Sequence, residues 1–140
     1  MLGAIKFKVE RRIDDPDAVW SRLSDLEQMP RYWGGHRVVR IVGRRSGILQ
    51  LEIQFAFPGP LNRGRAEAAV DEANREVLIN YIDGPFTGVV KNYVRGDVVA
   101  SEWDILLKPL FLPMKPWVVS HFRKGAESAL ERLAKGNALP

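Results

Sequence analysis

The composition of this chain is that of an ordinary globular protein that has no cysteine chemistry. It has 140 residues, of which 46% are hydrophobic and 27% charged, with a formal net charge of +4 and no cysteine. These values exclude disulfides, thiolate catalysis and cysteine metal sites, and they argue against intrinsic disorder. We therefore expect one domain over residues 1–140, large enough to bury a hydrophobic core.

The amino-terminal segment "MLGAIKFKVERR" favours an intracellular protein. It meets a lysine at Lys6 and then alternates polar and apolar residues, which is unlike a signal peptide. Nowhere does the chain approach the roughly 18 consecutive apolar residues that a membrane span needs. We expect a cytoplasmic location.

The first elements are a strand and a short helical pair. Residues 5–12 alternate strictly, with Ile5 and Phe7 on the apolar face, which predicts a half-buried strand. In the following "DDPDAVWSRLSDLEQMPRYW", Asp15 can cap a helix that has Pro16 at its first position. A second helical piece is expected to be limited by Pro30.

From about residue 37 to 108 the hydrophobic period is two, which is typical of strands. Strands are predicted over residues 38–42, 48–57, 65–71, 77–82, 86–95 and 98–107. Short turns separate them, so we expect an uninterrupted antiparallel meander. After Pro113 the period changes to that of an amphipathic helix, which is predicted to end near Gly136.

The order of these elements predicts an α+β fold. It reads strand, two short helices, six strands and a long C-terminal helix, written β-α-α-β6-α. A curved antiparallel sheet with one apolar face needs a cover for that face. The last helix is the only predicted element long enough, so we expect a seven-stranded sheet wrapped around it.

A two-residue turn at Gly96-Asp97 sets the register of the last hairpin. Asn92 is then opposite Ser101, and Val90 is opposite Trp103, all on the covered face. A buried polar group without a partner costs about 1–3 kcal/mol. The pair could satisfy itself, trap a water, or orient the polar end of a ligand in an apolar cavity.

Small and aromatic side chains share the predicted inner face. Gly88, Ala66 and Ala68 leave room there, which suits either a hollow or the close approach of the helix. The aromatic residues suit either a cavity wall or a solid core. The predicted ligand-binding residues are Trp33, Leu51, Ile53, Phe55, Phe57, Ala68, Tyr81, Val90, Asn92, Ser101, Trp103, Trp117 and Phe122.

Two segments carry a resemblance to a known superfamily. "VWSRLSDLEQMPRYW" (Val19–Trp33) is similar to the first helical segment of START-like proteins, also called the SRPBCC, Bet v 1-like or helix-grip superfamily. "DGPFTGVVKNYV" (Asp83–Val94) resembles a strand start in its coenzyme Q-binding and polyketide cyclase/lipid transport branch. With the order of elements, the resemblance covers nearly the whole chain. It implies a helix-grip fold whose cavity holds a lipid, an isoprenoid quinone or a polycyclic compound.

Support for catalysis is thin in the sequence. His36 and His121 are the only histidines, show no metal-type spacing with carboxylates, and are expected on the surface. The polar residues of the inner face are Tyr81, Asn92 and Ser101, and none has an ordinary pKa near 7. We therefore expect no catalytic residue, no metal and no cofactor.

The first functional hypothesis is a binding or transport protein for an apolar small molecule, with peripheral membrane contact left open. The loops "MPRYWGG", "FPGPLNRG" and "DGPFTG" would form the mouth of the cavity, and residues 58–61 its gate.

Two alternatives remain. A cyclase or dehydratase could use the same cavity, and an Asp, Glu or His lining it would favour that hypothesis. An accessory or assembly factor could instead bind a protein or RNA through an arginine-rich surface. That surface would comprise Arg40, Arg44, Arg45, Arg63 and Arg65. Nucleic acid is the less favoured partner, because the basic residues are interleaved with acidic ones.

Overall fold

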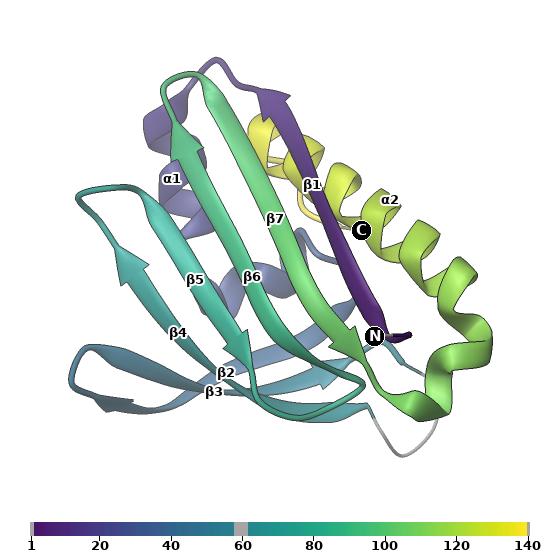
Figure 1. Ribbon diagram of the computed structural model, residues 1–140. Coiled ribbons are helices and arrows are strands. Elements are labelled where there is room, and N and C mark those ends of the chain that lie inside the picture. Colours follow the sequence, from purple (N-terminus) through teal and green to yellow (C-terminus); the bar gives the residue numbers. More distant parts are fainter. Residues whose placement is uncertain (1, 58–61, 140) are drawn as a thin grey trace.

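A curved sheet wraps around one long helix in the computed structural model, which describes residues 2–57 and 62–139 (Figure 1). Within these residues, seven antiparallel strands form one sheet in the order β1-β7-β6-β5-β4-β3-β2. The strands are β1 (Ala4–Arg12), β2 (His36–Arg45), β3 (Ile48–Phe55), β4 (Arg63–Asp71), β5 (Glu76–Tyr81), β6 (Phe86–Arg95) and β7 (Val98–Leu107). The helices are α1 (Pro16–Leu23), α2 (Lys115–Lys135) and the two 3₁₀-helices η1 (Leu26–Arg31) and η2 (Pro109–Met114).

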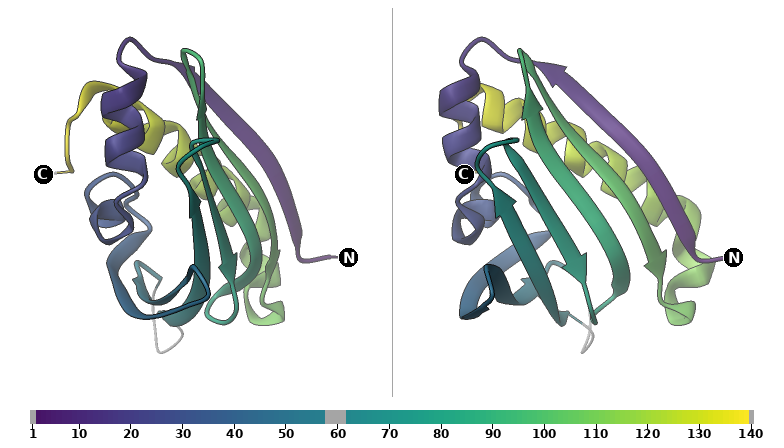
Figure 2. Two further views of the ribbon diagram at one scale, coloured as in Figure 1. Left: turned by 90° about the vertical axis from the view of Figure 1, so that its left-hand side faces the viewer. Right: turned by 60° about the vertical axis from the view of Figure 1, so that its left-hand side comes forward.

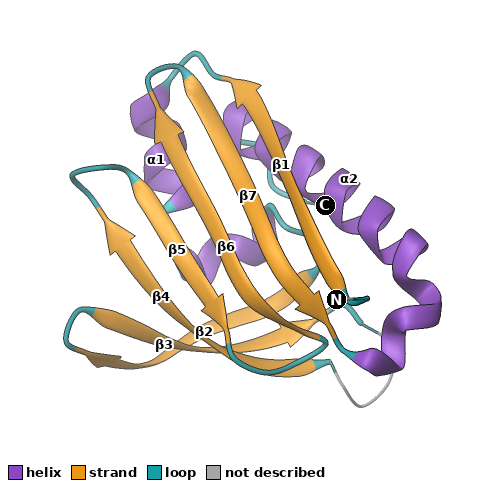
Figure 3. Ribbon diagram, in the orientation of Figure 1, coloured by secondary structure: helices purple, strands orange, loops and turns teal. Residues whose placement is uncertain are grey.

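This architecture is the predicted one. The helix-grip order of one strand, a helical pair, a six-stranded meander and a long C-terminal helix is confirmed (Figure 3). The register of the last hairpin is confirmed as well, since Asn92 pairs with Ser101 and Val90 with Trp103. In the described part of the chain, no helix is long and apolar enough to cross a membrane.

The β2–β3 hairpin is longer than predicted. The turn consists of Ser46 and Gly47 alone, both with positive φ (51° and 79°). Two consecutive positive-φ residues make a tight turn that matches the twist of the strands, so pairing continues as far as Arg45 and Ile48. The register of β2 shifts twice, and the first shift lies between His36 and Val38.

The helical pair and the second half of α2 close one end of the inner face. Asp15 accepts a hydrogen bond from the backbone nitrogen of Ala18 and caps α1, as predicted. Arg22 of α1 then donates to the carbonyl of Leu133 in α2 at 2.7 Å. Arg132 of α2 donates to the carbonyl of Tyr32 at 2.8 Å. These bonds anchor α2 at its carboxyl end.

The two halves of α2 differ in how they meet the sheet. In residues 127–135, the side chains of Ala129, Leu130 and Leu133 are fully buried in the core. In residues 115–126, Trp117 is 56% exposed and Phe122 is only partly buried. Figure 2 shows α2 crossing the open side of the curved sheet. Val118 and Ala126 of the first half are also buried, so that half contacts the core through these two residues while Trp117 remains exposed.

Candidate ligand pocket

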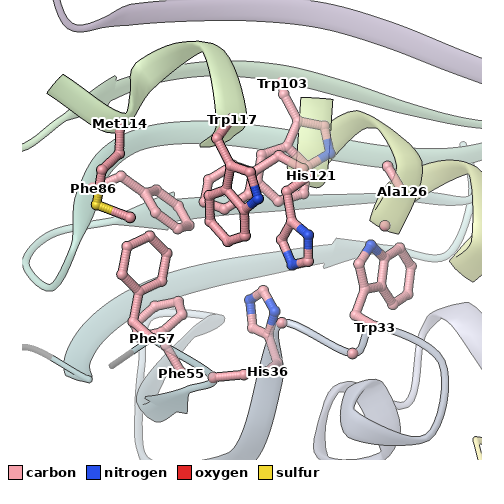
Figure 4. A pocket seen from close by; sticks show the side chains of 15 residues that line it. Trp33, His36, Phe55, Phe57, Phe86, Trp103, Met114, Trp117, His121 and Ala126 are labelled. Atoms are coloured by element: carbon pink, nitrogen blue, oxygen red, sulfur yellow. The ribbon is translucent and has the colours of Figure 1, made fainter. Parts of the chain in front are cut away.

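A pocket of about 100 Å³ lies between the first half of α2 and the inner face of the sheet (Figure 4). Six of the predicted ligand-binding residues line it: Trp33, Phe55, Phe57, Trp103, Trp117 and Phe122. Sequence reasoning missed its other lining residues, namely Gly34, Gly35, His36, Ala56, Phe86, Met114, His121, Gly125 and Ala126. The structure thus brings together aromatic side chains from the η1–β2 loop, three strands and α2.

The remaining predicted site residues do not line this pocket. They are Leu51, Ile53, Ala68, Tyr81, Val90, Asn92 and Ser101. Leu51, Ala68 and Val90 are each only 1% exposed and belong to the solid core. The small residues at this part of the inner face therefore allow close packing.

Asn92 and Ser101 satisfy each other. The Ser101 hydroxyl donates to Oδ1 of Asn92 at 2.5 Å, and Nε1 of Trp103 donates to Oγ of Ser101 at 2.8 Å. Of the three roles considered for the pair, mutual satisfaction is the one observed. The pair also orients the Trp103 indole, whose ring is part of the pocket wall.

Phe86, the first residue of β6, lies at the centre of the aromatic wall. Its ring centroid is 4.8 Å from that of Tyr81 and 5.4 Å from those of Phe55 and Phe122. The interplanar angles lie between 53° and 66°, the tilted and edge-on arrangement that aromatic rings prefer. These contacts define how the rings are arranged relative to one another in the wall.

His36 is buried, and the expectation of a surface position was wrong. Its side chain is 4% exposed and packs against the rings of Phe55 and Tyr81, 5.3 Å and 5.8 Å away between centroids. Strict alternation from Val39, which is on the inner face, would turn residue 36 outward. The register shift inserts Arg37 as an extra residue, so His36 pairs with Phe55 and faces inward.

His36 and Tyr81 form a neutral hydrogen-bonded pair beneath the pocket. Nε2 of His36 is 2.8 Å from the Tyr81 hydroxyl oxygen. Burial lowers the pKa of His36 to about 4 and raises the pKa of Tyr81 well above its ordinary value. Both side chains are therefore uncharged at neutral pH.

The hydrogen bond to Tyr81 also determines the His36 tautomer. Among the described residues, Tyr81 has no hydrogen-bond partner other than His36. A buried hydroxyl hydrogen without an acceptor is costly, so we assign Tyr81 as the donor and Nε2 as the acceptor. The ring proton is then on Nδ1, which has no partner within the described part of the chain.

Trp33 carries a second unpartnered donor in the same pocket. Its side chain is 4% exposed, and its indole Nε1 has no hydrogen-bond partner among residues 2–57 and 62–139. Figure 4 shows the rings of Trp33 and His36 projecting into the pocket. Two buried nitrogens of pocket-lining residues therefore have no hydrogen-bond partner in the described part of the chain.

His121 and Trp117 form the mouth of the pocket on α2. They are one helical turn apart and their rings stack, with centroids 4.6 Å apart and planes inclined by 10°. His121 is exposed, as predicted, but it also lines the pocket, which was not predicted. The signal that could have found it is the four-residue spacing of the two rings.

Each of the three predicted mouth loops contributes to the lining through one aromatic residue. "MPRYWGG" contributes Trp33, "FPGPLNRG" contributes Phe57 and "DGPFTG" contributes Phe86. The predicted gate, residues 58–61, lies outside the described residues.

The predicted arginine surface is interrupted by acidic side chains. A second hollow, lined mainly by β2, β3 and β4, includes Arg40, Arg63 and Arg65. Arg40 is paired with Glu52 at 3.5 Å, and Arg65 with Asp83 at 2.9 Å. The other two arginines of the predicted set do not line it. Across the described ranges, no group of three or more His, Asp or Glu side chains is placed to hold a metal ion.

No model of a known protein family matches the chain, and neither does any curated protein sequence. Solved structures do match. The Zhui aromatase/cyclase from a Streptomyces strain superposes with a TM-score of 0.67 at 15% identity, over 94% of this chain and 93% of that one. A STAR-related lipid transfer protein from Xanthomonas axonopodis superposes with a TM-score of 0.63 at 12% identity, over 91% and 85%.

Norcoclaurine synthase from Thalictrum flavum, solved with dopamine and hydroxybenzaldehyde, has a TM-score of 0.59 at 18% identity, over 95% of this chain and 86% of that one. At such identities the likeness is one of fold. The chain has the same helix-grip fold as these proteins, and the predicted resemblance is confirmed at the level of the fold.

Proposed function

We propose that this protein binds an apolar small molecule in the pocket beneath the first half of α2. The observation that carries the proposal is the aromatic lining, in which Phe55, Phe86, Trp103 and Phe122 surround an unfilled space of about 100 Å³. Ligand sites are typically concave and apolar with a few polar groups, and this pocket has that composition. Proteins of the same fold include a lipid transfer protein and an aromatase/cyclase, which supports the same class of ligand.

The size of the pocket limits what can enter it whole. An apolar cavity of about 150 Å³ in another protein binds benzene. A space of about 100 Å³, with the exposed Trp117 in its lining, therefore suits one aromatic ring or the end of a larger molecule. A complete lipid or polycyclic compound would require movement of α2 or of the mouth loops. Dopamine and hydroxybenzaldehyde, found with norcoclaurine synthase, are both one-ring compounds.

Native mass spectrometry of the purified protein, followed by solvent extraction, tests the proposal directly. We expect the mass spectrum to show a bound apolar compound. If the purified protein is empty, we expect it to take up a one-ring compound such as ethylbenzene. Tryptophan fluorescence can report that uptake, because Trp33, Trp103 and Trp117 line the pocket. A protein that carries no ligand and takes up none from a mixture of aromatic compounds, lipids and quinones would contradict it.

A matched pair of helix variants shows where the ligand binds. Gly125→Leu places a side chain in the pocket, where a Cβ at Gly125 would meet nothing within 4 Å. Lys124→Leu adds the same side chain at the adjacent exposed position, which does not line the pocket. The first variant should lose binding and the second should keep it.

A second candidate function is an enzyme that uses a histidine of this pocket. The observation that favours it is that His36 and His121 both line the pocket. The His121 imidazole could take a proton from the carbon next to a carbonyl group, leaving an enolate that His36 and Trp33 stabilise by hydrogen bonding. In D2O the enolate would regain a deuteron, so the methyl proton signal of acetophenone should fade with wild type and persist with His121→Gln. Equal signals with both proteins would reject this candidate.

A further inference from the structure

We infer that the ligand carries a carbonyl oxygen, and that Nε1 of Trp33 and Nδ1 of His36 donate hydrogen bonds to it. The inference deepens the proposed function and rests on it, because it identifies the chemical class of the molecule that occupies the same pocket. It also gives the polar part of the site a specific task, namely to orient one end of an otherwise apolar ligand.

Trp33 differs from the other two buried tryptophans in the hydrogen bonding of its indole nitrogen. Nε1 of Trp20 donates to Glu72 at 2.7 Å, and Nε1 of Trp103 donates to Ser101 at 2.8 Å. Trp33 is as deeply buried as these two, yet its nitrogen has no partner in the described part of the chain. A buried polar group without a partner is uncommon in folded proteins and points to an acceptor that the described chain does not itself supply.

His36 supplies an independent second donor. Its Nε2 is occupied by the Tyr81 hydroxyl, so the proton is on Nδ1, which is also buried and lacks a partner within the described residues. Because both unpartnered atoms are donors, the missing group must be an acceptor.

One tight turn carries both donors. The backbone nitrogen of His36 donates to the carbonyl of Trp33 at 3.2 Å, which closes a four-residue turn with Gly34 and Gly35 in the middle. The carbonyl of Gly35 accepts a bond from the nitrogen of Ala56 at 2.9 Å and attaches the turn to the end of β3. Neither glycine presents a side chain, so nothing from the turn itself fills the space beside the two rings.

A neutral carbonyl fits these donors better than an anion does. Its oxygen has two lone pairs, one for each donor, and no hydrogen of its own that would need an acceptor. The described lining residues include no lysine or arginine, so a carboxylate would be desolvated without a counter-charge. With the size of the pocket, the chemistry points to an aromatic aldehyde or ketone, or to the carbonyl-bearing ring of a larger molecule.

Acetophenone and ethylbenzene test the inference, because they have nearly the same shape and differ in the carbonyl group. Ethylbenzene is the more hydrophobic of the two, so burial alone would make it bind more tightly. Because the two donors can form hydrogen bonds only with the carbonyl compound, we expect acetophenone to bind about tenfold more tightly than ethylbenzene in calorimetric titration. Trp33→Phe should weaken acetophenone binding about fivefold and change ethylbenzene binding less than about twofold.

The outcomes separate this inference from the proposed function. If ethylbenzene binds as tightly as acetophenone or more so, the pocket is real but the carbonyl inference is wrong. If neither compound binds, the carbonyl inference fails, and uptake from the mixture of aromatic compounds, lipids and quinones decides the proposed function separately. If acetophenone is preferred equally by wild type and Trp33→Phe, the indole is not a donor and the assignment is overturned.

A spectroscopic measurement on the unchanged protein avoids any doubt about folding of the variants. The indole N–H proton of Trp33 should move downfield in the NMR spectrum when acetophenone is added, because it gains an acceptor. Ethylbenzene, which has no acceptor, should not produce this downfield shift of the Trp33 signal. The indole proton of Trp20 is the internal control, since Trp20 does not line the pocket and already donates to Glu72. A Trp33 signal that responds equally to both compounds would contradict the inference.

Discussion

Nε2 of His36 lies 2.8 Å from the hydroxyl oxygen of Tyr81, although the two residues belong to strands that are not neighbours in the sheet. β3 and β4 lie between β2 and β5, so a flat sheet would hold the two strands about 14 Å apart. Their side chains can meet because the sheet curves strongly there. The contact therefore closes the concave face beneath the pocket, where burial lowers the pKa of His36 and keeps its ring neutral.

The first prediction concerns pH. His36 has a pKa of about 4 when folded and an ordinary value of 6.5 when unfolded. Between these values the unfolded chain binds a proton that the folded one does not, so the free energy of unfolding falls as the pH is lowered through this window. The loss attributable to His36 should approach about 3 kcal/mol near pH 4. Urea unfolding at several pH values measures it.

Two histidine variants isolate this effect from the titration of carboxylates. His36→Gln removes the titrating group and offers Tyr81 another acceptor, so its stability should depend less on pH between 6.5 and 4 than that of wild type. His121→Gln, at an exposed position, should behave like wild type. Equal pH dependence in all three proteins would mean that His36 does not stay neutral on folding.

The second prediction compares two buried tryptophans. Trp33→Phe removes a donor that has no partner among the described residues, whereas Trp20→Phe removes one that bonds the Glu72 carboxylate at 2.7 Å. Both changes lose a similar contact area. We expect Trp20→Phe to be the more destabilising by about 1–2 kcal/mol in chemical denaturation, because a hydrogen bond to a charged group is lost only there. A larger loss in Trp33→Phe would show that its indole already has a partner.

The third prediction concerns the polar pair behind Trp103. Asn92→Leu should destabilise the protein by about 1–3 kcal/mol, because the Ser101 hydroxyl loses the oxygen to which it donates. Under conditions where the variant is fully folded, its affinity for the ligand should change little, since Asn92 does not line the pocket. Thermal unfolding and titration with acetophenone together measure the two effects. Unchanged stability with altered affinity would instead place Asn92 in the binding site.

The fourth prediction is a conflict between stability and binding at Gly125. Glycine in the interior of a helix is about 1 kcal/mol less favourable than alanine. A Cβ at this position would meet nothing within 4 Å, so Gly125→Ala should stabilise the protein by up to about that amount. Gly125 also lines the pocket, so the same methyl group should reduce the affinity for a one-ring ligand. Improved thermal stability with undiminished binding would show that the ligand does not reach Gly125.

The strands of the sheet and their order could be predicted from the sequence, because the patterns that indicate them are local and recur along the chain. Alternation of apolar residues in each strand, turn residues such as Gly96-Asp97 and the change of period after Pro113 each act over a few positions. A register is specified once a turn is placed, and this is why the partners of Asn92 and Val90 could be named in advance. The same alternation placed Phe55, Phe57 and Trp103 on the inner face and so identified three of the pocket's lining residues.

Which part of the inner face is hollow depends on tertiary packing that the sequence pattern does not reveal. The spacing of Leu51, Ala68 and Val90 is the same kind of alternation that places Phe55 in the pocket wall, yet those three are packed in solid core. The difference arises from how α2 crosses the sheet, tied down at its carboxyl end by α1 and the residues after η1. The buried position of His36 was not predicted for a related reason. One extra residue in β2 reverses the alternation, and no local sequence pattern indicates that residue.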